Sequence, residues 1–450
     1  MASSDPKKIP IIFDTDPGVD DIIALLLALS SPELEILAIL VSYGNTDVDS
    51  SYTNVLKTYQ VIQRHLDLYP EDAIRFPSFF NNMRTIICCG SKGPLQGPLH
   101  SASYFHGRDG LGGIHERHPE FNVTSNPKGL HYTDESGIDV ALNLLKGHEP
   151  RSITYVAVGP LTNLAKMMQK DSELVSTKVG RVICMGGALD VPGNTSPVAE
   201  CKYTFSLFQQ SVFSNRILLV NFYADPFAAR DLLGPKPPYK FPLPLDRFLL
   251  LPLDITTPHR LPFPLYQKRV DSCFGSSQAS PKPVTRFSSS FLTHTRQVMN
   301  EYEQDAMELH DIVAIWCAIY FPPFPNDLHM EEESVRGWKA AKRLFDIECT
   351  GELTRGMVVV DKRQDKTAYA PGANRAEVQA ELEQTHFSSG GDSKSVALPV
   401  PAQVEVDLAS ESNHKTDSDH RGVWCITETP GPDALLETLL ARVWGVQGWA

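Results

Sequence analysis

Residues 9–21 of the chain read IPIIFDTDPGVDD. The run from Ile9 to Phe13 is continuously apolar, which is typical of a strand buried on both faces in a parallel sheet. Acidic residues follow directly, at Asp14, Asp16, Asp20 and Asp21. The next apolar stretch, Ile22 to Leu29, predicts a buried helix that ends near Pro32. This segment therefore predicts a strand, an acidic turn and a helix, one after another.

The same alternation of strand and helix patterns continues along the chain. Apolar runs predict further strands over residues 36–41, 85–89, 153–158, 181–185, 248–255 and 423–427. Helical patterns cover residues 49–68, 138–145, 161–168, 312–320 and 434–444. This order favours an α/β fold with an open, mostly parallel sheet flanked by helices around a Rossmann-like core. In such sheets the ligand lies beyond the carboxyl ends of the strands, where the acidic turn stands.

We expect residues 1–450 to form a single domain with three irregular stretches. Residues 275–290 are rich in Ser and Pro and predict a surface loop. Residues 383–421 are polar and predict a disordered loop before the C-terminal strand and helix. Residues 201–220 form an atypical insertion between two motifs.

Composition narrows the class of protein. Asp and Glu outnumber Lys and Arg by 54 to 41, a net charge of −13 at pH 7. This balance argues against binding to a nucleic acid polymer or an anionic membrane. The 8 cysteines form no C-x-x-C pair, and we find no secretory or membrane-spanning run. We therefore expect a cytoplasmic protein that acts on a small molecule.

The acidic turn predicts a cation site. Helix capping accounts for one or two of its carboxylates, at roughly 0.3–1 kcal/mol each, but clustered carboxylates repel and need a cation or a shared proton. Oxygen ligands favour Ca²⁺ or Mg²⁺. An EF-hand is excluded, because the twelfth position of a loop starting at Asp14 is Leu25 rather than Glu. A haloacid-dehalogenase-type phosphatase stays as a weaker alternative, although that family expects Thr or Val where Gly18 stands.

The acidic turn also resembles the signature of the inosine–uridine preferring nucleoside hydrolases. Further motifs follow in that family's order and extend the resemblance over roughly residues 9–370 and the last thirty residues. They are Tyr43-Gly44-Asn45, His106-Gly107 with Asp109-Gly110-Leu111-Gly112, Val158 to Asn163, Met185 to Ala188, Gly193-Asn194, Pro197 with Ala199-Glu200, Tyr223 to Pro226, His310-Asp311 and Gly351 to Gly356.

The resemblance implies hydrolysis of the N-glycosidic bond of a purine or pyrimidine ribonucleoside, giving ribose and free base. It implies a Ca²⁺ ion with the ligands Asp16, Asp21, Asp311 and the backbone carbonyl of Val158. Asp16 would act as general base on a water molecule that Ca²⁺ positions. Ribose-binding positions carried over from the family are Asp20, Asn45, Asn194, Glu200, Asn221 and Asp311. Relatives of this fold form dimers or tetramers, so we expect a homo-oligomer.

Two histidines are candidates for contacts with the base. His310 precedes the expected ligand Asp311 at the start of an apolar helix, so it is expected near the metal, where it could protonate a leaving purine. The alternative for His310 is an ordinary core or surface histidine. His106 stands in a glycine-rich segment and is expected to contact the base, with a solvated loop histidine as the alternative.

The insertion separates two expected sugar contacts. In the family pattern Phe-Asn follows the sugar-binding Glu directly, whereas residues 201–220 stand between Glu200 and Asn221 here. Cys201-Lys202-Tyr203 can be encoded with GTAAGT, a splice-donor consensus, and Leu219-Val220 can contain the acceptor AG. Removing the intervening nucleotides keeps the frame and restores Phe before Asn221. We predict a retained intron, with a genuine insertion as the alternative. The interruption also motivates a second functional class, a non-catalytic relative that binds nucleoside or Ca²⁺.

Overall fold

A nine-stranded sheet forms the centre of the computed structural model. The structure describes residues 8–79, 85–191, 221–276, 280–323, 335, 337–351, 354–360 and 422–446. In spatial order the sheet contains β10 (Lys339–Arg343), β13 (Val423–Glu428), β7 (Phe248–Leu251), β6 (Val179–Met185), β5 (Ile153–Ala157), β1 (Ile9–Thr15), β2 (Leu34–Val41), β3 (Thr85–Cys89) and β4 (Leu130–Tyr132). Only β10, which pairs with β13, runs antiparallel to its neighbour. The expected open, mostly parallel α/β sheet is confirmed.

The strand order reverses next to β1. From β1 the chain builds β2, β3 and β4 on one side, and then returns to place β5, β6 and β7 on the other side. β1 therefore pairs with both β2 and β5. The carboxyl ends of β1 and β5 form a topological switch point, which is where open α/β sheets bind their ligands.

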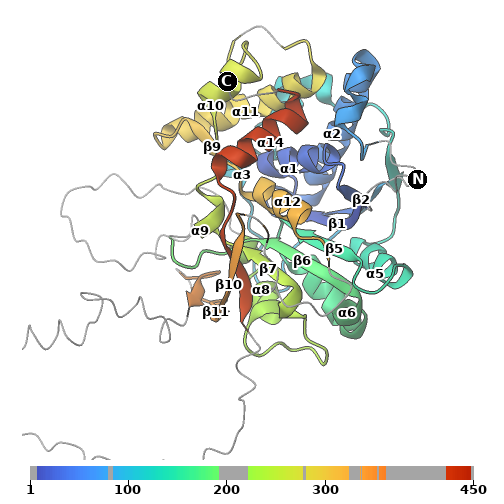
Figure 1. Ribbon diagram of the computed structural model, residues 1–450, viewed down its shortest axis with the longest axis vertical. Coiled ribbons are helices and arrows are strands. Elements are labelled where there is room, and N and C mark those ends of the chain that lie inside the picture. The colour runs from blue at the N-terminus through green and yellow to red at the C-terminus, as the bar shows by residue number, and fades with distance from the viewer. Residues whose placement is uncertain are drawn as a thin grey trace, which may run out of the picture. The chain divides into compact units, whose positions relative to one another are not determined.

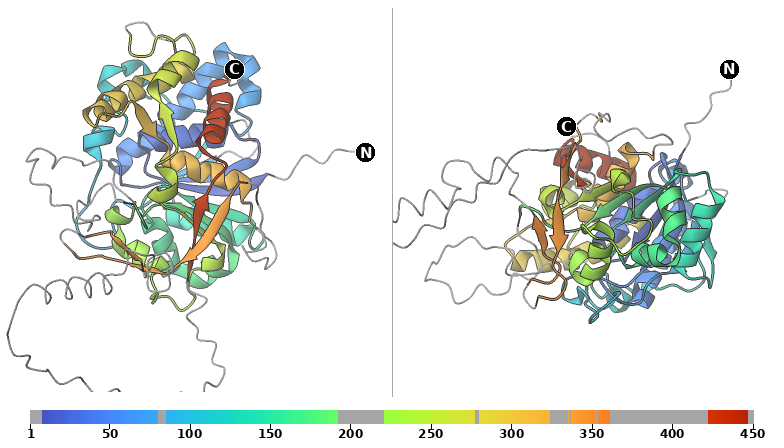
Figure 2. Two further views of the ribbon diagram at one scale, coloured as in Figure 1. Left: turned by 60° about the vertical axis from the view of Figure 1, so that its left-hand side comes forward. Right: turned by 90° about the horizontal axis from the view of Figure 1, so that it is seen from below.

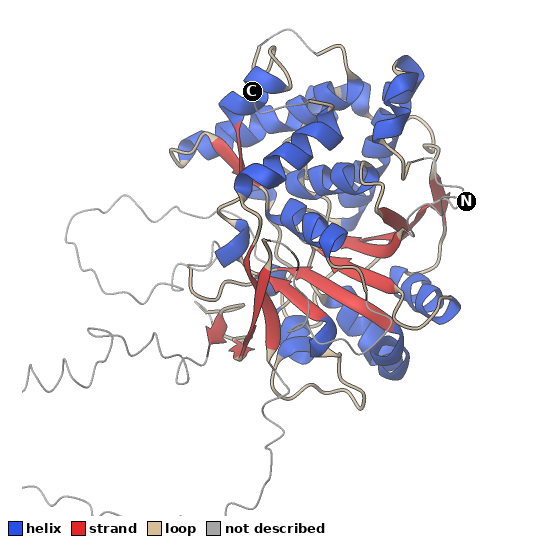
Figure 3. Ribbon diagram, in the orientation of Figure 1, coloured by secondary structure: helices blue, strands red, loops and turns tan. Residues whose placement is uncertain are grey.

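Helices cover both faces of the sheet, as the blue ribbons on either side of the red strands show in Figure 3. One face carries α1 (Val19–Leu29), α2 (Val48–Leu68), α11 (Pro283–Glu301), α12 (His310–Tyr320) and α14 (Pro432–Trp444) (Figure 1). The other face carries α5 (Gly137–Gly147), α6 (Thr162–Lys178) and α8 (Pro226–Leu233). All residues of α1 are buried, including Asp20 and Asp21, because it packs among the sheet, α12, α11 and α14.

Short elements connect the main ones. The short helices are α3 (Ser103–His106), α4 (Ile114–Arg117), α7 (Asn221–Ala224), α9 (Leu253–Thr256) and α10 (Phe263–Arg269), with 3₁₀ turns η1 (Pro70–Arg75), η2 (Pro119–Phe121) and η3 (Leu245–Arg247). Two small ladders pair β8 (Arg260–Pro262) with β9 (Ala306–Glu308), and β11 (Phe345–Ile347) with β12 (Val358–Val360). None of the helices in the described ranges is both long and apolar enough to span a bilayer.

The C-terminal segment returns to the core. Figure 2 shows β13 lying beside β10, and β13 also pairs with β7. The α14 helix then packs against α1, and Arg442 donates to both carboxylate oxygens of Glu33, in the turn between α1 and β2, at 2.7 and 2.8 Å. The predicted strand at 423–427 and helix at 434–444 are therefore present.

Two sequence expectations need correction. The predicted surface loop over 275–290 is wrong from Pro283 onward, because α11 begins there and buries its Val284 and Phe287 side chains. Pro fits the first turn of a helix, so it starts α11 rather than extending the loop. The strand predicted over 248–255 ends at Leu251, since Pro252 cannot donate to a ladder and α9 follows. Residues 201–220 and 383–421 lie outside the described residues.

The described residues, apart from Val360, belong to one compact unit made of residues 1–359 and 422–450. Residues 360–421 belong to a second unit. The single-domain expectation stays a prediction for the segment beyond Val360, which lies outside the described residues.

Candidate active site

The acidic loop, residues 14–21, lies at the switch point between β1 and β5. It links the end of β1 to the first turn of α1. The expected partners come from three other places: the segment after β2, the end of β5, and the start of α12. Four separate parts of the chain therefore supply the candidate site, and parallel β1 and β5 place two of them side by side.

Asp14 faces the core and has a structural role. Its carboxylate accepts hydrogen bonds from the Tyr155 hydroxyl at 2.6 Å and from Asn163 Nδ2 at 2.7 Å. Burial raises the pKa of Asp14 to about 7, against the lowering effect of these two donors. Asp14 therefore ties β1 to β5 and α6, and its carboxylate oxygens are used there.

Asp21 is the most completely bonded carboxylate of the acidic loop. Its Oδ1 accepts from the Thr15 hydroxyl at 2.6 Å and from the Asp16 backbone N–H at 3.2 Å. Its Oδ2 accepts from the Gly18 backbone N–H at 3.0 Å and from Asn45 Nδ2 at 2.8 Å. These donors fix the carboxylate in place, so Asp21 can serve as a rigid anchor for a cation.

Asp16 and Asp20 each carry one buried oxygen without a partner. Asp16 Oδ2 accepts the Asn45 backbone N–H at 2.8 Å, whereas its Oδ1 is shielded from solvent and has no hydrogen-bond partner. Asp20 Oδ1 is likewise buried and unpartnered. Leaving a buried carboxylate oxygen without a donor or cation is costly. Both atoms therefore fit a positively charged or hydrogen-bonding ligand.

Asp311 brings the far end of the chain to the same point. It lies in the first turn of α12 and is 3% exposed. One carboxylate oxygen from each of Asp20, Asp21 and Asp311 lies within 4.8 Å of the other two. Such a buried group of carboxylates could hold a metal ion, and its oxygen-only chemistry suits a hard cation.

The proton affinities at the site reflect this crowding. Burial and the charge of Asp21 raise the pKa of Asp20 to about 7, while His310 opposes the shift. Burial and the charge of Asp21 also raise the pKa of Asp16 well above its usual range. The pKa of Asp311 is raised well above its usual range by burial and then by the charges of Asp20, Asp21 and Asp16. The cluster could therefore hold either protons or a cation.

Asn221 joins the ends of two strands. Its Nδ2 donates to the backbone carbonyl of Val158 and, at 2.9 Å, to that of Met185. The Val158 carbonyl was expected to bind the metal, and a carbonyl oxygen has a second lone pair for that purpose. Asn221 thus stands at the ends of β5 and β6, and Asn45 stands beside Asp16 and Asp21.

His310 lies at the start of α12 with both ring nitrogens in hydrogen bonds. Nδ1 is 2.8 Å from the Thr256 hydroxyl and Nε2 is 3.0 Å from Glu308 Oε2. Arg260 contacts the same Glu308 carboxylate at 3.2 Å. The expected placement near the acidic cluster agrees with its effect on the pKa of Asp20. The sequence reasoning missed Thr256 and Glu308, although the Glu-x-His spacing before Asp311 was a readable signal.

His106 is buried, not solvated. It ends α3, is 0% exposed, and its Nδ1 accepts the Val19 backbone N–H at 3.1 Å. The glycine-rich loop that follows, residues 107–113, is fastened to the acidic loop by Asn54, whose Nδ2 donates to the carbonyls of Asp109 at 2.7 Å and Pro17 at 3.1 Å. Asn54 was also missed from the sequence.

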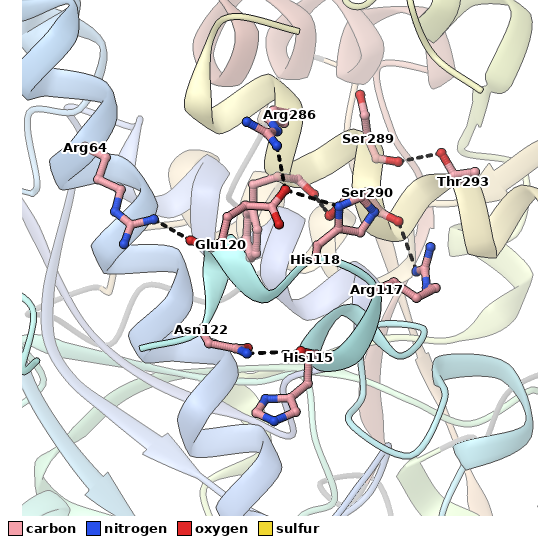
Figure 4. Close-up of polar contacts among 11 residues, drawn as sticks. Arg64, His115, Arg117, His118, Glu120, Asn122, Arg286, Ser289, Ser290 and Thr293 are labelled. Atoms are coloured by element: carbon pink, nitrogen blue, oxygen red, sulfur yellow. Dashed lines mark hydrogen bonds and ion pairs between the residues drawn. The ribbon is translucent and has the colours of Figure 1, made fainter. Parts of the chain in front are cut away.

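The segment after the glycine-rich loop is held between α2 and α11, as Figure 4 shows. Glu120 accepts from Arg286 of α11 at 2.6 Å, and its backbone carbonyl accepts from Arg64 of α2. Arg117 donates to the carbonyl of Ser290 at 3.1 Å. These contacts hold α11 over the glycine-rich loop and thus beside the acidic loop.

The structure therefore brings together most of the residues expected from sequence. Asp20, Asp21 and Asp311 form the cluster. Asp16 belongs to the same acidic loop, and its carboxylate accepts the Asn45 backbone N–H. Asn221 donates to the Val158 carbonyl, and His310 lies close enough to Asp20 to lower the pKa of that carboxyl. Asn194 and Glu200 lie outside the described residues. The individual roles of all these residues stay predictions.

Comparisons with known proteins identify relatives along most of the chain. The family model described as "Inosine-uridine preferring nucleoside hydrolase" matches residues 11–204 and 216–389. The break between the two matched parts lies inside the predicted insertion at 201–220.

Two curated relatives and one solved structure illustrate the similarity. An "Inosine-uridine preferring nucleoside hydrolase" from Leishmania major is 28% identical over 382 residues, 85% of this chain and 95% of the relative. "Probable uridine nucleosidase 2" from Arabidopsis thaliana is 36% identical over 202 residues, 45% of this chain and 54% of the relative. The structure titled "Inosine-Guanosine Nucleoside Hydrolase (IG-NH)" superposes with a TM-score of 0.60 at 20% identity, covering 98% of this chain and 100% of that one. The similarity to this solved structure supports the α/β fold of the chain.

Proposed function

Because the chain belongs to the inosine-uridine preferring nucleoside hydrolase family, we propose that it cleaves the N-glycosidic bond of ribonucleosides with water, giving ribose and free base. The observation that carries the proposal is the set of buried carboxylates at the β1–β5 switch point, two of which keep an unpartnered oxygen. Family membership does not favour the phosphatase alternative.

Ca²⁺ is the proposed cofactor. The residues that would hold it are Asp16, Asp21, Asp311 and the backbone carbonyl of Val158, and the compact oxygen cluster adds Asp20 as a neighbour. The fit is supported by the buried, unpartnered oxygens of Asp16 and Asp20 and by a donor set made only of oxygen. When bound, the ion would neutralise the clustered charge and help to place water and ribose hydroxyls.

Asp16 is the proposed general base. Its Oδ2 is occupied by the Asn45 backbone N–H, which leaves the unpartnered Oδ1 to accept a proton from water. General-base catalysis of this kind contributes about 10²–10⁴-fold to the rate.

The proposed ribose contacts surround the same point. Asp20, Asn45, Asn221 and Asp311 offer carboxylate and amide groups, which suit sugar hydroxyls. Asn194 and Glu200 remain predicted contacts outside the described residues. Hydrolysis of a glycosidic bond passes through a transition state resembling an oxocarbenium ion, so a rigid hold on the sugar lowers the barrier.

The leaving base is the proposed target of two histidines. His310 would donate a proton, which requires it to exchange one of its bonds to Thr256 or Glu308 for the base. His106 would contact the base through Nε2, since Nδ1 is bonded to Val19. We also expect a homo-oligomer, a dimer or a tetramer, which sedimentation of the purified protein tests.

The test is release of ribose from uridine and from inosine, with and without a calcium chelator. Replacing Asp16→Ala should lower kcat at least about 100-fold, and chelation should remove activity that added Ca²⁺ restores. Asp139→Ala, at a carboxyl group on α5 that is 42% exposed and pairs with Lys170 far from the acidic loop, is the matched control and should retain full activity. Ribose release that survives both Asp16→Ala and the chelator would refute the proposal. The ratio of the two substrates gives the base preference.

A second candidate function follows from the break in the family match. With residues 201–220 present, Glu200 and Asn221 are separated, and the chain could bind nucleoside or Ca²⁺ without cleaving. We propose that this segment is a retained intron. Transcript sequencing tests it: messages that carry all of these codons as the dominant form would contradict the intron. Comparing ribose release by the full chain and by the chain without 201–220 distinguishes enzyme from binding protein.

A further inference from the structure

Asp225 is a fully buried carboxylate that the proposed mechanism does not use. It stands between α7 and α8 and caps the first turn of α8, where its Oδ1 accepts the Ala228 backbone N–H at 3.0 Å. Its Oδ2 accepts two further donors, the Thr162 hydroxyl at 2.6 Å and the Leu95 backbone N–H at 2.7 Å. Capping the helix needs only the first of these bonds, so the other two join α8 to separate parts of the chain.

The hydrogen bonds around Thr162 form a chain with one direction. The Thr162 hydroxyl donates its single proton to Asp225, so it accepts from the Tyr43 hydroxyl, which lies 3.2 Å away. The Tyr43 hydroxyl also donates to the backbone carbonyl of Ala224 at 3.4 Å. Burial and the charge of Asp225 raise the pKa of Tyr43, so this hydroxyl keeps the proton that it donates. The chain therefore runs from Tyr43 through Thr162 to the Asp225 carboxylate.

Tyr43 connects this chain to the segment after β2. It stands two residues before Asn45, whose backbone N–H donates to Asp16 Oδ2 at 2.8 Å and whose Nδ2 donates to Asp21 Oδ2 at 2.8 Å. The intervening Gly44 packs so closely that a Cβ there would lie 1.9 Å from Asp16 Oδ2. Because there is so little space, a small shift of Tyr43 moves Asn45 relative to both carboxylates.

Thr162 and Asp225 connect the chain to the end of β5 and to α7. Thr162 begins α6, four residues after Val158 at the end of β5. The Asp225 backbone N–H donates to the Asn221 carbonyl at 3.3 Å, and Asn221 Nδ2 donates to the Val158 carbonyl. The Asp225 carboxylate therefore ties together three places that supply proposed ribose or calcium contacts.

We propose that Asp225 is a positioning residue for the ribose site, and that it acts through Thr162 and Tyr43 without touching the substrate. It sets the position of Asn45 relative to Asn221, the two amides that are proposed to bind sugar hydroxyls. A carboxylate suits this task because it accepts donors from three segments, whereas an amide has one acceptor oxygen and would turn an N–H group toward a donor. The inference rests on the proposed function, in which Asn45 holds the 2′ side of the ribose.

The test compares uridine with 2′-deoxyuridine, which lacks the hydroxyl that Asn45 is expected to hold. The ratio of their kcat/KM values is measured in the full chain and in Asp225→Asn. Because a displacement of about 1 Å at a reacting site costs up to about 100-fold, the preference for uridine should fall at least about 10-fold. Tyr43→Phe and Thr162→Val each remove one hydroxyl of the chain and should lower the preference about 2-fold to 10-fold. Thr162→Ser, which keeps the hydroxyl, should retain it.

A matched chain elsewhere in the fold separates positioning from stability. Tyr266 of α10 is also buried, and its hydroxyl lies 3.0 Å from that of Ser289, which donates to the buried Asp271 carboxylate at 2.6 Å. Tyr266→Phe and Asp271→Asn should lower the free energy of unfolding in urea, because each leaves a buried group without its partner. They should leave the preference for uridine unchanged, unlike Tyr43→Phe and Asp225→Asn.

The double variant Tyr43→Phe/Thr162→Val should lower the preference by less than the product of the two single effects, because both substitutions break the same chain. A full product, a preference unchanged in these variants, or an equal loss in Tyr266→Phe would overturn the inference. These two substitutions decide the question if Asp225→Asn does not fold.

The unmodified chain separates this inference from the proposed function. Binding of uridine without release of ribose would contradict the proposed function alone, and the ratio of the two dissociation constants, measured by calorimetry, then replaces the ratio of kcat/KM values. Absence of binding to either nucleoside would contradict both.

Discussion

Lowering the pH should weaken calcium binding, because carboxyl groups at the site hold protons that the cation must displace. Burial and the charge of Asp21 raise the pKa of Asp20 from 3.8 to about 7. At about pH 5.5 Asp20 is then protonated in roughly 97% of molecules, and at about pH 8 in roughly 10%. Displacing that proton weakens binding about 30-fold at the lower pH, or about 2 kcal/mol. Asp16 and Asp311, whose pKa values are also raised, add to the effect.

Without calcium, the same carboxyl groups make the folded protein less stable as the pH rises. A carboxyl group whose pKa is raised by folding binds protons more tightly in the folded state than in the unfolded chain. The cation-free protein therefore loses stability as the pH rises from about 4 through about 7, because the unfolded carboxyls ionise first. Calcium offsets this loss, so the stabilisation that it provides should grow over the same interval.

Calorimetric titration with CaCl₂ at the two pH values measures the change directly, and thermal unfolding gives an independent measure. A difference of about 2 kcal/mol corresponds to a change of about 2 °C in the calcium-induced shift of Tm for a chain of this size. Asp20→Asn should reduce the pH dependence, while Asp139→Asn, on the surface of α5, should leave it unchanged. Equal affinities at both pH values would refute the reasoning, as would the absence of any calcium binding.

Three further predictions concern stability, measured by urea unfolding. Tyr155→Phe removes the donor 2.6 Å from Asp14 and should cost about 1–3 kcal/mol, more at about pH 8 than at about pH 5.5, because burial raises the pKa of Asp14 to about 7. Phe287→Ala should cost about 3–5 kcal/mol, since the ring packs edge-on against two buried phenylalanines. Asn54→Ala should cost about 1–3 kcal/mol and weaken calcium binding, because it releases the glycine-rich loop from Pro17.

Exposed positions provide the controls for these variants. Tyr320→Phe, Gln297→Ala and Asn143→Ala should each change the free energy of unfolding by less than about 0.5 kcal/mol. A cost for Tyr155→Phe that is independent of pH would contradict the role given to Asp14. A cost for Phe287→Ala no larger than that of Gln297→Ala would contradict its placement in the core. Calcium affinity unchanged by Asn54→Ala would mean that the two loops are not coupled.

The fold could be predicted where local pattern and packing agree. The continuous apolar run of β1 predicts a buried strand, and the acidic turn after it marks the boundary between that strand and α1. The start of α11 was misjudged because its composition is polar. Ser288 and Ser290 bond their hydroxyls to carbonyls of their own helix, at 3.0 Å to Val284 and 2.6 Å to Phe287. The hydroxyl groups of these serines are therefore satisfied without water, so the apolar side of α11 can be buried and the segment forms a helix.

Only part of the candidate site could be predicted from local sequence. Asp16, Asp20 and Asp21 are neighbours in the chain, so their proximity follows from covalent connection. Asp311 comes from a distant segment, and only the family resemblance placed it beside them before the structure did. Glu308 and His310 are close in the chain, but their partners Arg260 and Thr256 come from an earlier segment that the β8–β9 ladder brings alongside, and no local pattern indicated that ladder. Long-range pairing of short strands is what single-sequence reasoning lacks.

The place of β13 in the sheet bears on how the protein is made. β13 fills the gap between β7 and β10, yet Val423–Glu428 leaves the ribosome after every other strand of that sheet. Throughout translation, β7 presents a bare row of amide and carbonyl groups to its surroundings, and open edges of this kind recruit foreign strands. The nascent polypeptide should therefore depend on chaperones until β13 has emerged from the ribosome. A premature stop codon upstream of Val423 should yield an aggregating product rather than a shortened enzyme.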